Sequence, residues 1–120
     1  MIEEKKKEEL FFAGLLAYEE KDFFEAHEMW EELWSEYYLD DKTFIQGLIQ
    51  LAVHLGNGNL KGAKSLLKKS TDKFSSYSGL HRDINIDKLK QQIVIIKNEY
   101  EQLLTVEGFD WTHIPDLRNI

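Results

Sequence analysis

Hydrophobic residues recur along most of the chain at intervals of three and four, with charged residues between them, a spacing typical of amphipathic helices. The pattern is interrupted by aspartates or by glycine and asparagine, which commonly end one helix and cap the next. It predicts an all-α fold with five helices. We expect the helices over the following stretches: Glu3 to about Glu20, Phe23 to about Tyr38, Lys42 to about Leu55, Leu60 to about Phe74, and Lys88 to about Leu104.

A weak internal repeat suggests how these helices are paired. Residues Lys21–Trp30 align without gaps on Gly58–Leu67, which places Asp22 and Asn59 at equivalent helix-capping positions. Each copy follows a helix and a short turn, so the first four helices are expected to form two helical hairpins of the tetratricopeptide type. Two hairpins are too few for an open solenoid. We therefore expect a compact bundle that the C-terminal helix closes, with residues 1–120 forming a single domain.

Short polar residues predict where the helices begin. Asp40 or Asp41 is expected to cap the third helix and Asp87 the fifth, with the longest loop running from Ser75 to Ile86. Three hydrophobic residues of the C-terminal tail are expected to pack back over the bundle: Phe109, Trp111 and Ile114. Three further residues show no spacing that would assign them a role: His81, Arg82 and His113.

Composition excludes several functions. The 120 residues carry a formal net charge of -7 and no basic block, which argues against binding to the nucleic-acid backbone. There is no cysteine, so disulfides and thiolate chemistry are excluded. The charged N-terminus is unlike a signal peptide, and no apolar run reaches the length of a membrane span. We expect a cytoplasmic protein with neither a nucleic-acid nor a membrane partner.

The stretch from Thr43 to Leu60 contains no charged residue, and the helix that ends within it at about Leu55 is predicted to be the central one. Its apolar residues cover more than half of the helical wheel, and the remaining sector carries a polar strip: Gln46, Gly47, Gln50 and His54. On the preceding helix, His27 lies on the inward apolar face and Glu31, one turn later, lies at its edge. If the two helices are antiparallel neighbours, the strip and the His27–Glu31 pair are expected to face each other across a buried polar cluster.

Three interpretations of this cluster remain open. It is a buried hydrogen-bond network that fixes helix register, a binding or catalytic pocket in which Glu31 holds His27 as it would hold a general base, or a metal site of two imidazoles and one carboxylate. The chain lacks the His-Glu-x-x-His, phosphate-loop and nucleophile-elbow motifs of known enzyme classes. We therefore expect a non-enzymatic module that binds a protein or a small molecule, with no metal and no cofactor. The alternative is a small hydrolase or metal-dependent enzyme that uses His27 and Glu31.

Three blocks of the sequence resemble a known family. They are Phe24–Glu28 with Trp30, Glu31 and Trp34, then Gln46–Ala52, then Gly58–Asn59 with Gly62 and Ala63. Together, over about Phe23 to Leu67, they resemble the small helical family known as domain of unknown function 309. The resemblance implies a compact, mainly prokaryotic all-α bundle with no established activity, and it supplies no catalytic residue.

The motif of this family refines the expected site. The positions that match it are His27, Glu28, Glu31, Gln46, Gly47 and Gln50. In the family, the link between the second and third blocks is often longer and carries its own histidine, which leaves open whether His54 takes that place here. The expected binding residues are His27, Glu28, Glu31, Gln46, Gln50 and His54. Val94 and Ile95 widen the apolar stripe of the fifth helix and suggest a homodimer face.

Overall fold

The structure is a computed structural model that describes residues 2–118, in which five α-helices, one β-hairpin and two short 3-10 helices follow one another. Their bounds are α1 Ile2–Glu19, α2 Phe23–Glu36, α3 Lys42–Leu55, α4 Leu60–Phe74, β1 Leu80–His81, β2 Ile84–Asn85, α5 Ile86–Tyr100, η1 Val106–Gly108 and η2 Trp111–His113. The predicted all-α fold of five helices is therefore confirmed, apart from the small hairpin. The extent of the single domain stays a prediction.

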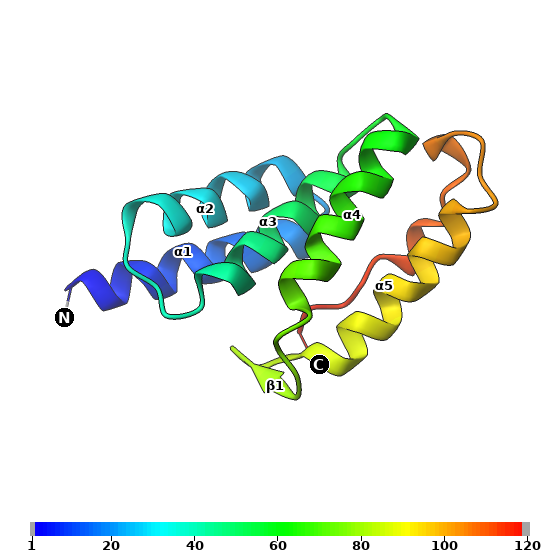
Figure 1. Ribbon diagram of the computed structural model, residues 1–120. Coiled ribbons are helices and arrows are strands. Elements are labelled where there is room, and N and C mark those ends of the chain that lie inside the picture. The colour runs from blue at the N-terminus through cyan, green and yellow to red at the C-terminus, as the bar shows by residue number, and fades with distance from the viewer. Residues whose placement is uncertain (1, 119–120) are drawn as a thin grey trace.

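The helices are arranged as two pairs that share a long interface. α1 packs on α2 and α3 packs on α4, while α2 also packs on α3 and joins the pairs (Figure 1). α5 lies beside α4, and the tail after α5 returns along it toward the start of that helix (Figure 1). The predicted pairing into two hairpins, closed by the C-terminal helix, is confirmed. None of the helices in residues 2–118 combines the length and the apolar character needed to cross a membrane.

The internal repeat corresponds to real structural equivalence between α2 and α4. The side chain of Asp22 accepts a hydrogen bond from the Glu25 amide at 3.1 Å, and the side chain of Asn59 accepts one from the Gly62 amide at 3.0 Å. Such caps satisfy amide groups that have no partner within the helix. Each repeat also buries an alanine completely, Ala26 in the first copy and Ala63 in the second. Because a methyl group needs little room, the first helix of each hairpin packs closely on the second.

The fifth helix begins and ends earlier than predicted. α5 starts at Ile86 because Asn85, rather than Asp87, caps it by accepting a hydrogen bond from the Lys88 amide at 3.0 Å. Asp87 instead accepts a hydrogen bond from the Gly79 amide of the preceding loop at 3.3 Å. The helix ends at Tyr100, four residues before the predicted end. α2 likewise ends at Glu36, because the next residue already has extended backbone angles.

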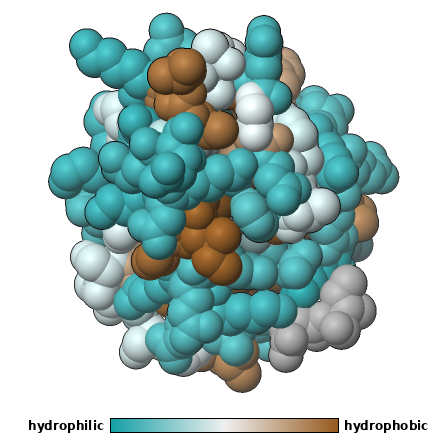
Figure 2. All heavy atoms as spheres, turned by 90° about the vertical axis from the view of Figure 1, so that its right-hand side faces the viewer, coloured by the Kyte–Doolittle hydropathy of each residue, from teal (hydrophilic) through white to brown (hydrophobic). Residues whose placement is uncertain are grey.

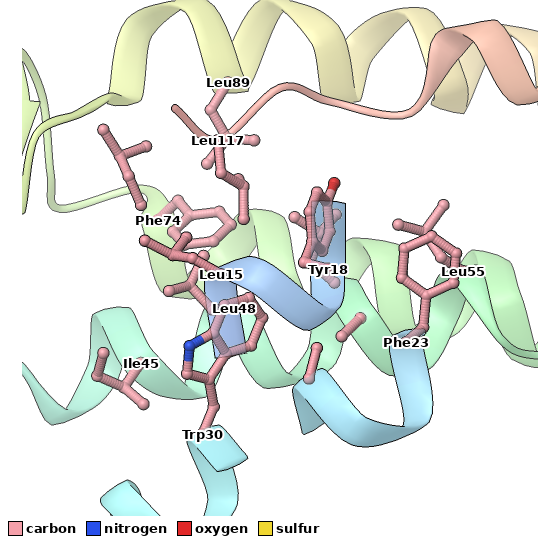
Figure 3. Packing of buried hydrophobic residues seen from close by; sticks show 14 of the residues in the cluster. Leu15, Tyr18, Phe23, Trp30, Ile45, Leu48, Leu55, Phe74, Leu89 and Leu117 are labelled. Atoms are coloured by element: carbon pink, nitrogen blue, oxygen red, sulfur yellow. The ribbon is translucent and has the colours of Figure 1, made fainter. Parts of the chain in front are cut away.

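The core contains side chains from all five helices and from the tail (Figure 3). Trp30 of α2 has no exposed surface, and its indole Nε1 donates a hydrogen bond to the carbonyl of Phe11 on α1 at 3.1 Å. The tail contributes Leu117, which is 2% exposed, and the tail carbonyl of Pro115 accepts a hydrogen bond from the Tyr18 hydroxyl at 2.8 Å. The tail is therefore part of the core.

Of the three tail residues expected to pack back, two do so clearly. Phe109 is 7% exposed and Ile114 packs partly buried against the core. Trp111 remains 47% exposed, although its ring stacks on that of Phe23 with the two planes inclined by 13°. This aromatic contact joins the tail to the start of α2, and both rings line the same pocket.

Candidate functional site

The predicted His27–Glu31 pair forms, but it lies at the surface of α2. His27 Nε2 is 2.6 Å from Glu31 Oε2, and His27 Nδ1 is 3.6 Å from Glu28 Oε1. The side chains of Glu31 and Glu28 are 56% and 49% exposed, and that of His27 is 23% exposed. The prediction that this pair belongs to a buried cluster is wrong, because α2 places the carboxylate side of the pair toward solvent.

The polar strip of α3 faces α4 and α5 instead of α2. At Gly47, a Cβ atom would lie 2.7 Å from the Phe74 ring of α4, and the Gly47 carbonyl accepts a hydrogen bond from the Ser70 hydroxyl at 2.8 Å. Close approach at this glycine therefore serves the contact with α4. Gln46 and Gln50 are partly buried, and Gln50 Oε1 has no hydrogen-bond partner among residues 2–118. The predicted cluster between the second and third helices is therefore not formed.

His54, at the end of the strip, is 1% exposed and lies against Tyr100 of α5. Its Nδ1 is 2.7 Å from the carbonyl of Leu51, and because a carbonyl can only accept, Nδ1 carries the proton. In the neutral ring, Nε2 is then an acceptor. This buried atom has no hydrogen-bond partner in the part of the chain that the structure describes. Burial lowers the pKa of His54 to about 4, although the hydrogen bond to Leu51 opposes that shift, so the ring is neutral at pH 7.

His54 lines a pocket of about 500 Å³ between the end of α3, the end of α5 and the tail. We call it the His54 pocket, and its lining residues are Lys21, Phe23, His54, Leu55, Gly56, Asn57, Gly58, Tyr100, Val106, Phe109 and Trp111. Four of these are aromatic. Burial and the charge of Glu99 raise the pKa of Tyr100 to about 12, so its hydroxyl stays protonated. Figure 2 shows this end of the molecule as a mostly hydrophilic surface with a small hydrophobic patch near its centre.

The tail wall of the His54 pocket is held to α5 by Glu99. One carboxylate oxygen accepts a hydrogen bond from the Asp110 amide at 2.6 Å, and the other is 2.7 Å from His113 Nδ1. The hydrogen bond to Glu99 raises the pKa of His113, and the charges of Asp110 and Glu99 act in the same direction. His113, to which spacing assigned no role, therefore holds the segment that carries Phe109 and Trp111.

The two predicted histidines line different pockets. His27 lines a smaller pocket of about 230 Å³, which we call the His27 pocket, together with Phe23, Phe24, Ala52, Val53 and Gly56. Phe23 and Gly56 line both pockets and so lie between them. His27 and His54 therefore line neighbouring pockets, and the binding residues expected from the sequence stay a prediction. Within residues 2–118, no group of three or more histidine, aspartate or glutamate side chains is placed to hold a metal ion.

A second polar cluster, formed by Asp41, His81 and Arg82, was not predicted from the sequence. Asp41 stands at the start of α3, but its side chain does not cap the helix. It accepts hydrogen bonds from Arg82 Nη2 at 3.0 Å and Arg82 Nε at 2.5 Å, and it lies 2.7 Å from His81 Nε2. Burial opposes the charged carboxylate, but the hydrogen bonds from Arg82 and His81 outweigh it and hold the pKa of Asp41 below its ordinary value.

The β-hairpin that presents His81 and Arg82 has a strained turn. Arg82 and Asp83 both have left-handed backbone conformations, with φ of 50° and 62°. Such a two-residue turn matches the twist of the strands but favours asparagine and glycine. The Arg82 guanidinium also lies 4.7 Å from the centre of the Phe11 ring, so α1 contributes to holding it. This cluster joins α1, α3 and the hairpin, and we interpret it as structural.

Replacing Asp41 by Asn should destabilise the protein by about 2 kcal/mol, because the partly buried Arg82 loses its countercharge. The cost is below that of a fully buried pair, since the Arg82 side chain is 25% exposed. Urea unfolding followed by circular dichroism measures the difference. Asp40→Asn is the matched control, because the neighbouring side chain is exposed. Equal midpoints for the two variants would show that the cluster contributes nothing to stability.

Comparison with known proteins gives a family match and a relative, and adds no activity. Residues 11–66 match the family described as Domain of unknown function (DUF309). It is 31% identical over 102 residues to the uncharacterized protein YpuF of Bacillus subtilis (strain 168). That alignment covers 79% of this chain and 56% of YpuF, so the chain spans little more than half of its relative. No solved structure matches the chain significantly.

Proposed function

We propose that the protein is a non-enzymatic module that binds a small molecule in the His54 pocket. The observation that carries this proposal is the buried Nε2 of His54, an acceptor with no hydrogen-bond partner among the described residues, on a side chain that lines the pocket. A buried polar atom without a partner costs about 1–3 kcal/mol. A ligand that donates a hydrogen bond there would recover that energy on binding, which makes the atom useful for recognition.

The rest of the pocket supports this function. Its volume of about 500 Å³ is in the range of sites for small ligands, and its aromatic walls provide apolar contact area. His54 and Tyr100 are both buried, and each belongs to a helix end that packs on the core. The acceptor therefore has a defined position before a ligand arrives, which reduces the entropy cost of binding.

A screen of small aromatic and heteroaromatic compounds by protein-observed NMR tests the proposal. Compounds that bind should shift the amide signals of Gly58 and Phe109 and the indole signal of Trp111. His54→Phe keeps a planar ring but removes the acceptor, so it should weaken binding by about tenfold. His27→Phe is the matched control and should leave affinity unchanged. The proposal is refuted if no compound in the screen, even at high concentration, shifts the signals of the pocket residues.

The alternative of a small hydrolase or metal-dependent enzyme stays a prediction. The observation that favours it is the contact of 2.6 Å between His27 and Glu31 beside the apolar His27 pocket. The same screen separates the two candidates. Compounds that bind at the alternative site would instead shift the signals of Phe24 and Val53. If their binding is lost in His27→Phe but kept in His54→Phe, the binding site is the His27 pocket on α2 and not the His54 pocket.

Protein partners stay a prediction as well. Val94 and Ile95 on α5 are 52% and 48% exposed, which is compatible with the expected homodimer face. These two residues lie outside the lining of the His54 pocket. Ligand binding in that pocket therefore requires no second subunit in this proposal.

A further inference from the structure

We propose that the ligand of the His54 pocket is a small aromatic anion whose ring carries an N–H or O–H donor. This inference rests on the proposed function and narrows it to a class of compound. Three features of the pocket lead to it: the protonation of His54, the arrangement of the aromatic side chains, and the charge of the lining residues. Each feature selects one property of the ligand.

The donor on the ligand follows from the tautomer of His54. The carbonyl of Leu51 requires a proton on Nδ1, so Nε2 presents a lone pair. The ring is held edge-on to Tyr100, with the two planes inclined by 79° and the centroids 6.0 Å apart. The other tautomer, with the proton on Nε2, would leave the Nδ1 lone pair facing the Leu51 carbonyl. A ligand group that reaches this buried atom must therefore donate a hydrogen bond to it.

The aromatic ring of the ligand follows from the walls. Phe23 and Trp111 are nearly parallel, with centroids 6.3 Å apart, and Phe109 meets Trp111 nearly edge to face. Phe109 also contacts Tyr100, so the aromatic side chains form a continuous surface from the tail to His54. Flat surfaces of this kind favour planar ligands, because aromatic rings gain energy from offset stacking and edge contacts. One or two fused rings fit a pocket of about 500 Å³.

The negative charge of the ligand follows from Lys21. Among the described residues that line the pocket, Lys21 alone is charged, and no aspartate or glutamate lines it. The carbonyls at the end of α3 would attract a cation, but those of Ala52, Val53 and His54 already accept hydrogen bonds from the amides of Gly56 and Asn57. An anionic group near the exposed Lys21 is therefore favoured over a cationic one.

Three indole compounds test this ligand class with one ring system. Indoleacetate has both the ring donor and the anion, its N-methyl derivative lacks the donor, and tryptamine replaces the anion with a cation. Isothermal titration calorimetry on the full chain should give the tightest binding for indoleacetate. The N-methyl derivative should bind about tenfold more weakly, because the acceptor of His54 remains unsatisfied. Tryptamine should also bind more weakly than indoleacetate.

Two variants assign these differences to residues. His54→Phe should remove the preference for indoleacetate over its N-methyl derivative. Lys21→Asn should reduce the affinity for indoleacetate by about two- to fivefold at low salt, since the ammonium is exposed. Asparagine suits this position because Lys21 has a left-handed backbone with φ of 64°. The affinity for indoleacetate should also fall more steeply with salt in wild type than in Lys21→Asn, which would further support the ion pair.

The outcomes distinguish the ligand class from the proposed function. Equal binding of indoleacetate and its N-methyl derivative, or tighter binding of tryptamine, would overturn the ligand class while leaving ligand binding at this pocket intact. The same holds if compounds from the NMR screen bind there but none of the indoles does. If neither the screen nor the indoles shift any signal of the pocket, the proposed function fails and the ligand class fails with it.

Discussion

Replacing Gly14 by Ala is expected to destabilise the protein by about 3 kcal/mol or more, the largest effect expected from a single methyl group in this chain. A Cβ atom at Gly14 would lie 2.1 Å from Trp30 Nε1 and 2.5 Å from two ring carbons. Trp30 is fully buried and donates its indole hydrogen bond to Phe11, so the ring has no room to move without losing that bond. Overpacking and the lost hydrogen bond each cost about 1–3 kcal/mol.

Helix propensity works in the opposite direction but is too small to compensate. Alanine is favoured over glycine in a helix interior by about 1 kcal/mol. Gly58→Ala is the matched control, since a Cβ there meets nothing within 4 Å, and we expect a change of less than about 0.5 kcal/mol. Urea unfolding followed by circular dichroism compares the two. A Gly14→Ala protein with the midpoint of wild type would contradict the packing described for α1 and α2.

A double variant identifies the clash itself. Trp30→Phe has a smaller ring and lacks Nε1, so it loses the hydrogen bond to Phe11 and leaves a cavity. Once that ring is shortened, adding the methyl group at Gly14 should cost much less than it does in wild type. The two substitutions should therefore be strongly non-additive. Additive costs would place the strain of Gly14→Ala somewhere other than the indole.

The features that sequence predicted well are local. The helices follow from hydrophobic periodicity, and the caps at Asp22 and Asn59 follow from side chains that reach an amide three residues away. The internal repeat added the pairing of the helices, because equivalent buried alanines mark equivalent contacts. The helix and cap signals depend on residues within a few positions of one another, whereas the repeat compares segments 37 residues apart. They needed no knowledge of which helix lies beside which.

The errors concern partners far apart in the chain. Asp41 has the sequence signature of a cap, but the Arg82 guanidinium binds its carboxylate and is a stronger partner than a backbone amide. Nothing near Arg82 predicts this contact, and the turn at Arg82 and Asp83 lacks the usual asparagine and glycine. Likewise, the burial of Leu117 depends on the return of the whole tail to the core.

The predicted buried cluster between the second and third helices does not form, and the reason is geometric. Periodicity correctly placed Gln46, Gly47, Gln50 and His54 on one side of α3, but it could not say which neighbour covers that side. α3 contacts both α2 and α4, and two helices on different sides of a third present different residues to it. The signal that could have separated them is Gly47, since the repeat makes α4 the closely packed partner of α3. His54 lines the pocket proposed as the site, whereas Tyr100 and the tail residues that also line it were not among the expected binding residues.

The stability of the protein should fall by about 2–3 kcal/mol between pH 7 and pH 4.5 because of His54 alone. Its pKa is about 4 in the folded protein and 6.5 as an ordinary side chain. Below pH 6.5 the unfolded chain binds a proton that the folded chain excludes, so the stabilisation present above pH 6.5 is lost as the pH falls toward 4. Each unit of difference corresponds to about 1.4 kcal/mol. His54→Phe should remove this part of the pH dependence.

The range from pH 7 to pH 4.5 separates the effect of His54 from the effects of the other groups whose pKa is shifted. The lowered pKa values of Asp41 and Asp110 mean that their stabilisation is lost only as the pH falls below about 3.8. The raised pKa of His113 has the opposite sign, because its stabilisation is complete below pH 6.5 and is lost only at higher pH. Free energies of unfolding for wild type and His54→Phe, measured by urea titration from pH 7 to pH 4.5, should therefore diverge through His54. If the free energies of unfolding of wild type and His54→Phe stayed parallel over this range, the protonated imidazole of His54 would be reached by water. Its Nε2 would then not be a buried acceptor.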